Sequence, residues 1–268
     1  MLLPRRSVDR ATQRPDAKAQ MDTVTTKRVS LAAVLALAAA IVALALAATA
    51  VVRYRGGEVH FASALNTFEW GVYTAGAGLL LSLIGLWRAR PGGRRRGFTP
   101  AVLGLVIALP LVAYGMAFEY TARIYPPIND VSTDTEDPPS FWEVPNPVAY
   151  PGAQVAALQQ QGYPDLKPLE LDMTSAAAFA LAVAVARDSG WEIVSEKPDD
   201  LQLEAVATTW LFGFKDNVAV RVQDVDGGAR LDVRSHSRLG RIDRGANAKR
   251  IRSYLRTLEQ RAAESSDG

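Results

Sequence analysis

The sequence contains no cysteine and only two histidines, His60 and His236, among its 268 residues. Without cysteine there are no disulfides, no thiolate nucleophile and no zinc site built on thiolates. Two histidines that lie far apart in the sequence offer little for a histidine-based metal site or a Ser-His-Asp triad. We therefore expect no metal ion and no cofactor, and the composition assigns no catalytic residue.

A strong excess of one charge is also absent, since the net charge is +2. This balance hides two unlike halves. Residues 1–120 carry 14 Lys and Arg against 6 Asp and Glu, whereas residues 121–268 carry 16 against 22. No general argument for nucleic-acid binding follows from such a balance, so we expect no nucleic acid as a partner.

Apolar residues are concentrated in three runs of the first half, at residues 29–52, 68–87 and 100–118. About 20 apolar residues in a helix cross a hydrocarbon core about 30 Å thick, so each run predicts a membrane span. The acidic residues closest to the runs, Glu69 and Glu119, lie near their ends, which indicates no ion path through the bilayer centre. Residues 29–120 are therefore expected to be a plain three-span anchor, with the lipid bilayer as its partner.

The start of the chain leaves two alternatives open. Residues 1–28 are polar and basic and predict a disordered cytoplasmic tail. Translation from Met21 would remove most of that tail, and a signal peptide cleaved after Ala48-Thr49-Ala50 would remove the first span. The first run is longer than the apolar part of a usual signal peptide, which favours an uncleaved helix.

The distribution of arginine predicts the orientation of the spans. The loop after the second run has its arginines within residues 88–96, at Arg88, Arg90, Arg94, Arg95 and Arg96, whereas the loop after the first run has only Arg53 and Arg55. Loops rich in Lys and Arg stay in the cytoplasm. The N-terminus and the second loop are therefore expected in the cytoplasm, and residues 121–268 on the other side of the membrane.

Residues 121–149 open the second half with a segment that holds six of the 15 prolines. Each proline disfavours helix at the residue before it, so extended, irregular structure is expected. An acidic cluster, at Asp130, Asp134, Glu136 and Asp137, is similar to a calcium loop in its alternating oxygen ligands. Thr135 stands where that loop requires glycine, and Phe141 where it requires glutamate. We expect these carboxylates to form Asx turns or to pair with the arginines around Arg234 to Arg244.

Residues 150–262 alternate helical and strand patterns. Helices are predicted at residues 151–163, at 176–186 after the N-cap Thr174, and after the N-cap Asp243. Strands are predicted at residues 191–196, 201–209, 217–225 and 229–235, with a hairpin turn at Asp226-Gly227-Gly228. The predicted fold class is α+β, with three N-terminal transmembrane helices followed by a four-stranded antiparallel meander flanked by helices. Residues 263–268 are expected to be a tail.

Residues 231–251 form the strand–turn–helix junction with the most polar side chains. Its candidate ligand-binding residues are Arg234, Ser235, Ser237, Arg238, Asp243, Arg244 and Asn247, with Arg241 beside them. The free N–H groups of a helix N-terminus favour an anion, so the junction predicts a basic, anion-binding turn. The anion would be a phospholipid head group, a glycan or an acidic envelope protein. In the structural alternative, the arginines pair with carboxylates of the domain and the hydroxyls cap the turn.

A second arginine lies on the predicted hairpin that leads into this junction. Arg221 and Arg234 stand on its two strands, and if they share the outer face they extend the basic surface.

A hydrolase is the second functional hypothesis. Ser235 and Ser237 flank His236, but neighbours on a strand point to opposite faces and rarely meet. Asp216 with Asp232 would be a pair of carboxylates for acid–base chemistry. A third hypothesis is a structural partner in an envelope complex, which contacts another protein through the acidic segment and an exposed strand edge. The sequence favours a non-enzymatic binding or assembly module over both.

Three blocks of sequence together resemble the bacterial family catalogued as domain of unknown function 1499. They are PPINDVSTDTEDPPSF (Pro126–Phe141), EAVATTWLFGFKDNVAVRV (Glu204–Val222) and DVRSHSRLGRIDRGANAKRI (Asp232–Ile251). The resemblance covers roughly residues 121–262 and implies no activity and no catalytic residues. Members of that family join the domain to hydrophobic N-terminal spans, which agrees with the topology inferred from charge. Taken together with the charge pattern, the resemblance to a bacterial family leads us to expect a multi-pass protein of the inner membrane, with a periplasmic C-terminal domain.

Overall fold

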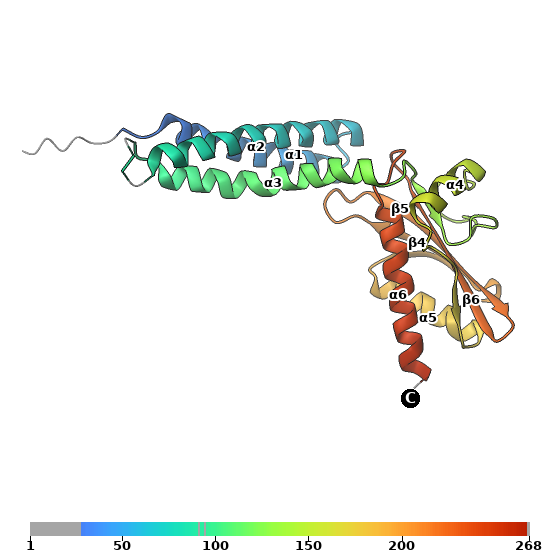
Figure 1. Ribbon diagram of the computed structural model, residues 1–268. Helices are drawn as coiled ribbons and strands as arrows, with labels where there is room; N and C mark the ends of the chain where they lie inside the picture. The colour runs from blue at the N-terminus through green and yellow to red at the C-terminus, as the bar shows by residue number, and fades with distance from the viewer. Residues whose placement is uncertain (1–27, 91, 94, 267–268) are drawn as a thin grey trace, which may run out of the picture.

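The computed structural model describes residues 28–90, 92, 93 and 95–266. Three long helices lie side by side as a bundle, and the second half of the chain forms an α+β domain at one end of it (Figure 1). Almost all of the predicted N-terminal tail, together with Met21, lies outside the described residues. The predicted C-terminal tail is largely helical, because the last helix continues to Ser266.

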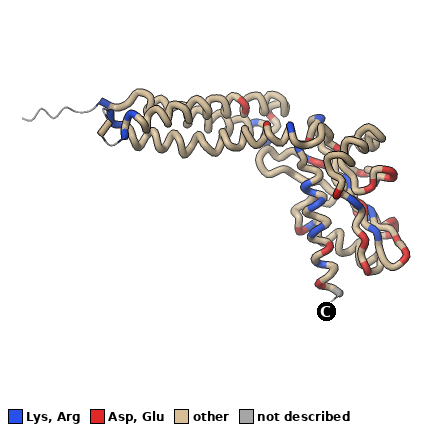
Figure 2. Tube along the Cα trace, viewed as in Figure 1, with Lys and Arg blue, Asp and Glu red and all other residues tan. Residues whose placement is uncertain are grey.

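The bundle consists of α1 (Leu31–Arg55), α2 (Phe61–Ala89) and α3 (Phe98–Ile124). Each helix is long and apolar enough to cross a membrane. Charged residues lie toward the two ends of the bundle and leave its middle free of them, whereas they are spread through the α+β domain (Figure 2). This distribution suits a bundle whose middle lies in hydrocarbon.

Small residues form the contact between the first two helices. One row of α1 is buried alanine, at Ala33, Ala36, Ala40, Ala43, Ala47 and Ala50. A Cβ atom added at Gly78 of α2 would lie 3.3 Å from the backbone nitrogen of Ala40, and one added at Gly85 would lie 3.0 Å from the Cα of Ala33. In lipid, such close backbone approach is a main source of helix association, since apolar side chains gain little by leaving apolar solvent.

The domain is built on a six-stranded antiparallel sheet of β1 (Asp130–Ser132), β2 (Leu169–Leu171), β3 (Glu192–Lys197), β4 (Gln202–Thr208), β5 (Lys215–Val225) and β6 (Gly228–Ser237). The strand order is β1-β6-β5-β4-β3, and β2 also pairs with β6. The α+β class and the four predicted strands, β3 to β6, are confirmed.

The predicted meander is incomplete, because β1 and β2 extend the sheet along the free edge of β6. β1 lies within the segment that was expected to be irregular throughout. Its three residues are extended because they pair with residues 234–236 of β6, and local sequence does not reveal such a distant partner.

Two helices, α5 (Ser175–Asp188) and α6 (Ala246–Ser266), cover one face of the sheet. Thr174 caps α5 as predicted, since its hydroxyl accepts the N–H of Ala177 at 3.3 Å. Between the helices, the hydroxyl of Tyr254 donates to the carbonyl of Ala182 at 2.7 Å. The alternating residues of β5 and β6, such as Val220 and Leu231, are buried beneath these helices and form the main core.

An irregular segment covers the opposite face of the sheet. We call it the strap, residues 133–150. Its Phe141 and Val144 pack on Ala219 of β5 in a small apolar cluster. The short elements α4 (Ala153–Gly162) and η1 (Pro198–Asp200) complete the domain. The sheet is therefore enclosed by helices on one side and by the strap on the other.

Candidate functional site

The side chains of β6 alternate between the two faces of the sheet and divide the predicted site. Ser235 and Ser237 point to the helical face, and Arg234 points to the strap. Arg221 and Arg234 do share a face, because their partners across the hairpin are Asp232 and Ala219. The expected basic outer surface is nevertheless wrong. Both arginines lie under the strap, and carboxylates neutralise both.

Arg234 is almost completely buried, at 1% exposed. Its guanidinium donates Nε and Nη2 to the two carboxylate oxygens of Asp130, at 2.9 and 2.7 Å. It also donates to the backbone carbonyls of Pro139 and Val148 in the strap, at 3.2 and 3.1 Å. The ring of Phe141 lies 4.5 Å from the guanidinium carbon. The bidentate pair with Asp130 and these further contacts occupy the guanidinium of Arg234. The structural alternative, in which the arginine pairs with a carboxylate of the domain, therefore holds for Arg234.

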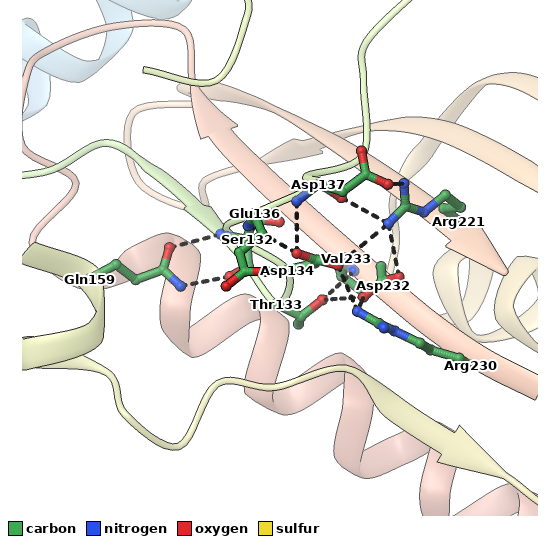
Figure 3. A network of polar contacts seen from close by, with 10 residues as sticks. All are labelled: Ser132, Thr133, Asp134, Glu136, Asp137, Gln159, Arg221, Arg230, Asp232 and Val233. Atoms are coloured by element: carbon green, nitrogen blue, oxygen red, sulfur yellow. Dashed lines mark hydrogen bonds and ion pairs between the residues drawn. The ribbon is translucent and has the colours of Figure 1, made fainter. Parts of the chain in front are cut away.

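A second ion-pair network fastens the start of the strap to the hairpin (Figure 3). Asp232, fully buried, accepts from Arg221 at 3.1 Å and from Arg230 at 3.4 Å. Both arginines also reach the strap, where Arg230 donates to Asp134 at 2.6 Å and Arg221 to Asp137 at 2.8 Å. The predicted pairing with the arginines around Arg234 to Arg244 is confirmed for Asp130, which pairs with Arg234. It is wrong for Asp134 and Asp137, which pair with the earlier hairpin residues Arg230 and Arg221.

Asp134 also forms the Asx turn that the sequence predicted. Its Oδ1 accepts the backbone N–H groups of Glu136 and Asp137, at 3.0 and 2.9 Å. One carboxylate therefore folds the strap locally and ties it to Arg230.

Glu204 of β4 is a contact that sequence reasoning missed. Its fully buried carboxylate accepts the backbone N–H groups of Trp142, Glu143 and Val144, at 2.5, 2.7 and 2.9 Å. Within the described residues no Lys or Arg pairs with it, so three amide dipoles take the place of a counter-ion. The one available signal was an acidic residue in the middle of an otherwise apolar strand.

Asn247 organises the helical side of the predicted site. Its amide nitrogen donates to the carbonyl of Asn129 and to the hydroxyl of Ser237, both at 3.0 Å. Its amide oxygen accepts from Ser235 at 2.8 Å and from Arg250 at 2.5 Å. All four hydrogen-bonding positions of the amide are used inside the domain, so these residues join β6 to α6.

Asp243 occupies the helix N-terminus that was expected to attract an external anion. Its carboxylate accepts the N–H of Gly245 at 2.7 Å and that of Asn247 at 3.1 Å, as the predicted cap. Burial raises the pKa of Asp243 above its ordinary value, and the hydrogen bonds from Gly245 and Asn247 oppose that rise. The anion favoured by the N-terminus of α6 is therefore already supplied by the chain.

Three arginines of the turn remain outside these networks, Arg238, Arg241 and Arg244. Arg238 donates Nε to the amide oxygen of Asn217 at 2.6 Å, and Arg241 is exposed. Arg244 lies with its guanidinium carbon 3.7 Å from the ring centre of Phe118, and donates Nε to the Phe118 carbonyl at 3.3 Å. Among the described residues none of the three is paired with a carboxylate. We call residues 238–244 the arginine turn.

The three sequence blocks that resemble a known family meet in these contacts, since they supply the strap, the β4–β5 hairpin and the β6–α6 junction. Residues 130–258 match the family model of DUF1499, a protein of unknown function. The match supports the family resemblance for the soluble domain. No curated protein matches the chain. Because the description of DUF1499 names no activity, the match indicates no function.

Within the DUF1499 match, the catalytic pairs considered under the hydrolase hypothesis do not form. Asp216 pairs with Arg250 on the helical face, whereas Asp232 lies on the strap face, so the proposed carboxylate pair is wrong. His236 points away from its serine neighbours and lies 6.3 Å, ring to ring, from Phe141. Burial lowers the pKa of His236.

One groove opens on the surface of the DUF1499 region, between the strap and α4. It has a volume of about 610 Å³ and is lined by Glu136, Tyr150 and Gln160 among others. Tyr150 has a buried hydroxyl with no hydrogen-bond partner among the described residues. Burial raises the pKa of Tyr150 to about 12, so this hydroxyl is neutral at physiological pH.

Proposed function

We propose that this protein is a non-enzymatic binding module of the bacterial envelope, held at the inner membrane by three spans. In this proposal the N-terminus is cytoplasmic and the α+β domain periplasmic. The domain binds an anionic phospholipid head group at the arginine turn. The strap network and the β6–α6 junction form the rigid frame that carries the turn.

The observation that carries the proposal is that the domain's arginines fall into two groups, those paired with a carboxylate and those without one. Those on the hairpin pair with carboxylates, as Arg221, Arg230 and Arg234 do. The three of the arginine turn have no carboxylate partner among the described residues and keep an uncompensated charge. Arginine suits a phosphate or carboxylate ligand, because its planar fork makes two parallel hydrogen bonds to either group.

The position of the arginine turn favours a lipid as the source of that anion. Arg244 rests on Phe118, which lies near the end of α3 where the bundle meets the domain. The exposed tyrosines Tyr114 and Tyr120 flank this level of α3, as interfacial aromatic residues do. A cation held at that level is within reach of head-group phosphates.

The orientation rests on the positive charge at the opposite end of the bundle. There Arg88, Arg90 and Arg95 line a cavity of about 590 Å³ next to Trp87. At the domain end, Arg55 is engaged by the carbonyls of Trp210 and Leu211. An excess of arginines at one end favours the cytoplasm for that end.

A structural partner that adds a strand to the sheet is the weaker candidate. Among the residues that the structure describes, β3 pairs only with β4, and its other edge has no partner strand. That edge strand carries Glu192, Glu196 and Lys197, and its register shifts between Ile193 and Ser195. Charges and irregular register on an edge strand discourage pairing with another chain.

The binding proposal is tested on the full chain in a neutral detergent with short-chain phosphatidylglycerol. We expect this lipid to raise the midpoint of thermal unfolding, whereas short-chain phosphatidylcholine does not. Arg241→Ala should reduce the shift without lowering the midpoint of the free protein, since Arg241 is exposed. The matched control is Lys249→Ala, which removes an exposed cation from α6 and should leave the shift unchanged. An equal shift in Arg241→Ala and wild type would refute a role of the arginine turn.

The orientation is tested with single cysteines, because the chain has none of its own. Asp226→Cys lies in the exposed β5–β6 turn and Arg95→Cys in the loop between α2 and α3. In intact spheroplasts a membrane-impermeant maleimide should label position 226 alone, and both positions after permeabilisation. Labelling of position 95 alone in intact spheroplasts would reverse the proposed topology.

A further inference from the structure

The loop between β4 and β5, residues 209–214 with the sequence TWLFGF, combines two opposite environments. Phe212 is 4% exposed, whereas Trp210 is 87% exposed, more than any other large apolar residue that the structure describes. We call this segment the aromatic loop. An indole so far out of the protein is unusual for a residue that normally buries most of its surface.

Phe212 and Phe214 fasten the aromatic loop to the helix bundle. Phe212 lies edge-on to Tyr54 of α1 and Phe68 of α2, with ring centres 6.2 and 5.4 Å apart. Phe214 lies 5.0 Å from Tyr54 and stacks on Phe212 at 5.1 Å. Such aromatic pairs add about 0.5–1.5 kcal/mol each beyond the area that they bury. The loop is therefore seated on the ends of α1 and α2.

Hydrogen bonds fix the direction in which Trp210 points. Thr209 closes the loop, because its backbone N–H donates to the Phe214 carbonyl at 2.8 Å and its hydroxyl accepts the Phe214 N–H at 2.9 Å. Arg55 of α1 donates to the carbonyls of Trp210 and Leu211, at 3.0 and 3.4 Å. A closed loop with both carbonyls held has little freedom to fold the indole back onto the domain.

The level of the loop along the bundle identifies what surrounds the indole. Phe68 touches Tyr114 of α3, with ring centres 5.6 Å apart, and the exposed Trp70 and Tyr73 follow Phe68 on α2. Exposed tryptophan and tyrosine gather where a bilayer meets water, because their rings are apolar and their N–H or O–H groups are polar. Phe212 packs on this aromatic level, so Trp210 stands beside it.

We propose that Trp210 inserts its indole into the boundary between head groups and acyl chains, on the same side of the membrane as the domain. The inference rests on the membrane placement in the proposed function and adds a second lipid contact to it. The aromatic loop thereby holds the domain to the bilayer next to α1 and α2, independently of the covalent link through α3. The occupant of this surface is lipid, because the loop sits on helices long and apolar enough to span it.

The test uses single-cysteine variants of the full chain, reconstituted in liposomes of phosphatidylethanolamine and phosphatidylglycerol. Trp210→Cys carries an environment-sensitive fluorophore. Trp70→Cys is the lipid reference, since it lies on the aromatic level of α2. Asp226→Cys is the aqueous reference, at the far end of β5, an 11-residue strand that spans about 36 Å at about 3.3 Å per residue. Each variant must keep the unfolding midpoint of wild type.

The result expected is a loss of fluorescence with lipid-attached quenchers at position 210 as large as at position 70, while position 226 responds to iodide only. Position 210 behaving like position 226 would overturn the inference and leave the proposed function standing. Protection of position 210 from both quenchers would also overturn it, since a protein would then cover the loop. If position 70 is also insensitive to lipid quenchers, the membrane placement itself fails.

Discussion

The two faces of the sheet are enclosed by different means. On one face, α5 and α6 bury alternating aliphatic residues such as Val220 and Leu231. On the other, the irregular strap is held by Arg234, by the Asp232 network and by the carboxylate of Glu204. The apolar cover depends on volume and tolerates similar side chains. The polar cover depends on paired groups, and the loss of one partner leaves a buried charge.

The largest loss of stability is expected from a substitution on the polar face of the sheet, which the strap covers. Arg234→Ala leaves the fully buried carboxylate of Asp130 without its partner and removes two bonds to strap carbonyls. We expect a loss of about 3–5 kcal/mol in the free energy of unfolding, measured by urea denaturation of the full chain in detergent. A loss below about 1 kcal/mol would show that the strap does not depend on this pair.

Glu204→Gln is expected to cost less, about 1–3 kcal/mol, because the amide offers one acceptor oxygen and turns a donor toward the remaining N–H groups. Hydrogen exchange of the backbone N–H groups in this variant should distinguish the two faces of the sheet. The N–H groups of residues 142–144 should exchange faster, while those of Leu231 and Val233 stay protected. The matched control is Glu196→Gln, whose partner Arg187 is exposed. Uniformly faster exchange over both faces would mean that they are one cooperative unit.

His236 makes the polar face sensitive to acid. Its folded pKa is lower than the ordinary 6.5 because burial disfavours the charged form. The unfolded chain then binds a proton more readily than the folded one, so stability falls as the pH drops below about 6.5. Asp130 opposes this shift and Arg234 and Arg238 add to it. His236→Gln should lose less stability than wild type between pH 7.5 and 5.5, and an equal loss would exclude His236 as the cause.

The smallest loss of stability is expected for an exposed ion pair that takes no part in covering either face of the sheet. Arg252 contacts Asp165 in two hydrogen bonds, but the side chains are 33% and 56% exposed. Arg252→Ala should cost about 0–1 kcal/mol, because solvent screens such pairs. A cost close to that of Arg234→Ala would remove the distinction between buried and exposed pairs on which the comparison rests.

Sequence patterns predicted the apolar face well and the polar face poorly. Strands β3 to β6 follow from residues that alternate along the chain, and α5 from a capped apolar run, so both signals are local. The partners of Arg234, by contrast, lie about a hundred residues away. The sequence showed a cluster of arginines near the turn. It did not indicate which arginine would be buried with Asp130 and which would have no carboxylate partner.

The same limit explains the misjudged helix N-terminus. The pattern at Asp243 correctly predicted a cap for α6, but an unfilled anion site was also expected at the same N–H groups. One carboxylate cannot cap a helix and leave its N-terminus free. The strap contact of Glu204 had a single signal, an acidic residue within an apolar strand, and nothing pointed to its partners, because they are backbone groups whose position no side chain reveals.

The link between bundle and domain has a mechanical consequence. After α3 ends at Ile124, the chain is fixed almost at once, since the carbonyls of Ile128 and Asn129 accept N–H groups of Asp243 and Ser237 at 2.9 Å. β1 then runs antiparallel to β6, where Asp130 meets Arg234. Tension between bundle and domain would therefore be transmitted first to β1, where ladder hydrogen bonds and an ion pair resist it. The strap, which comes later in the chain, is shielded from that force.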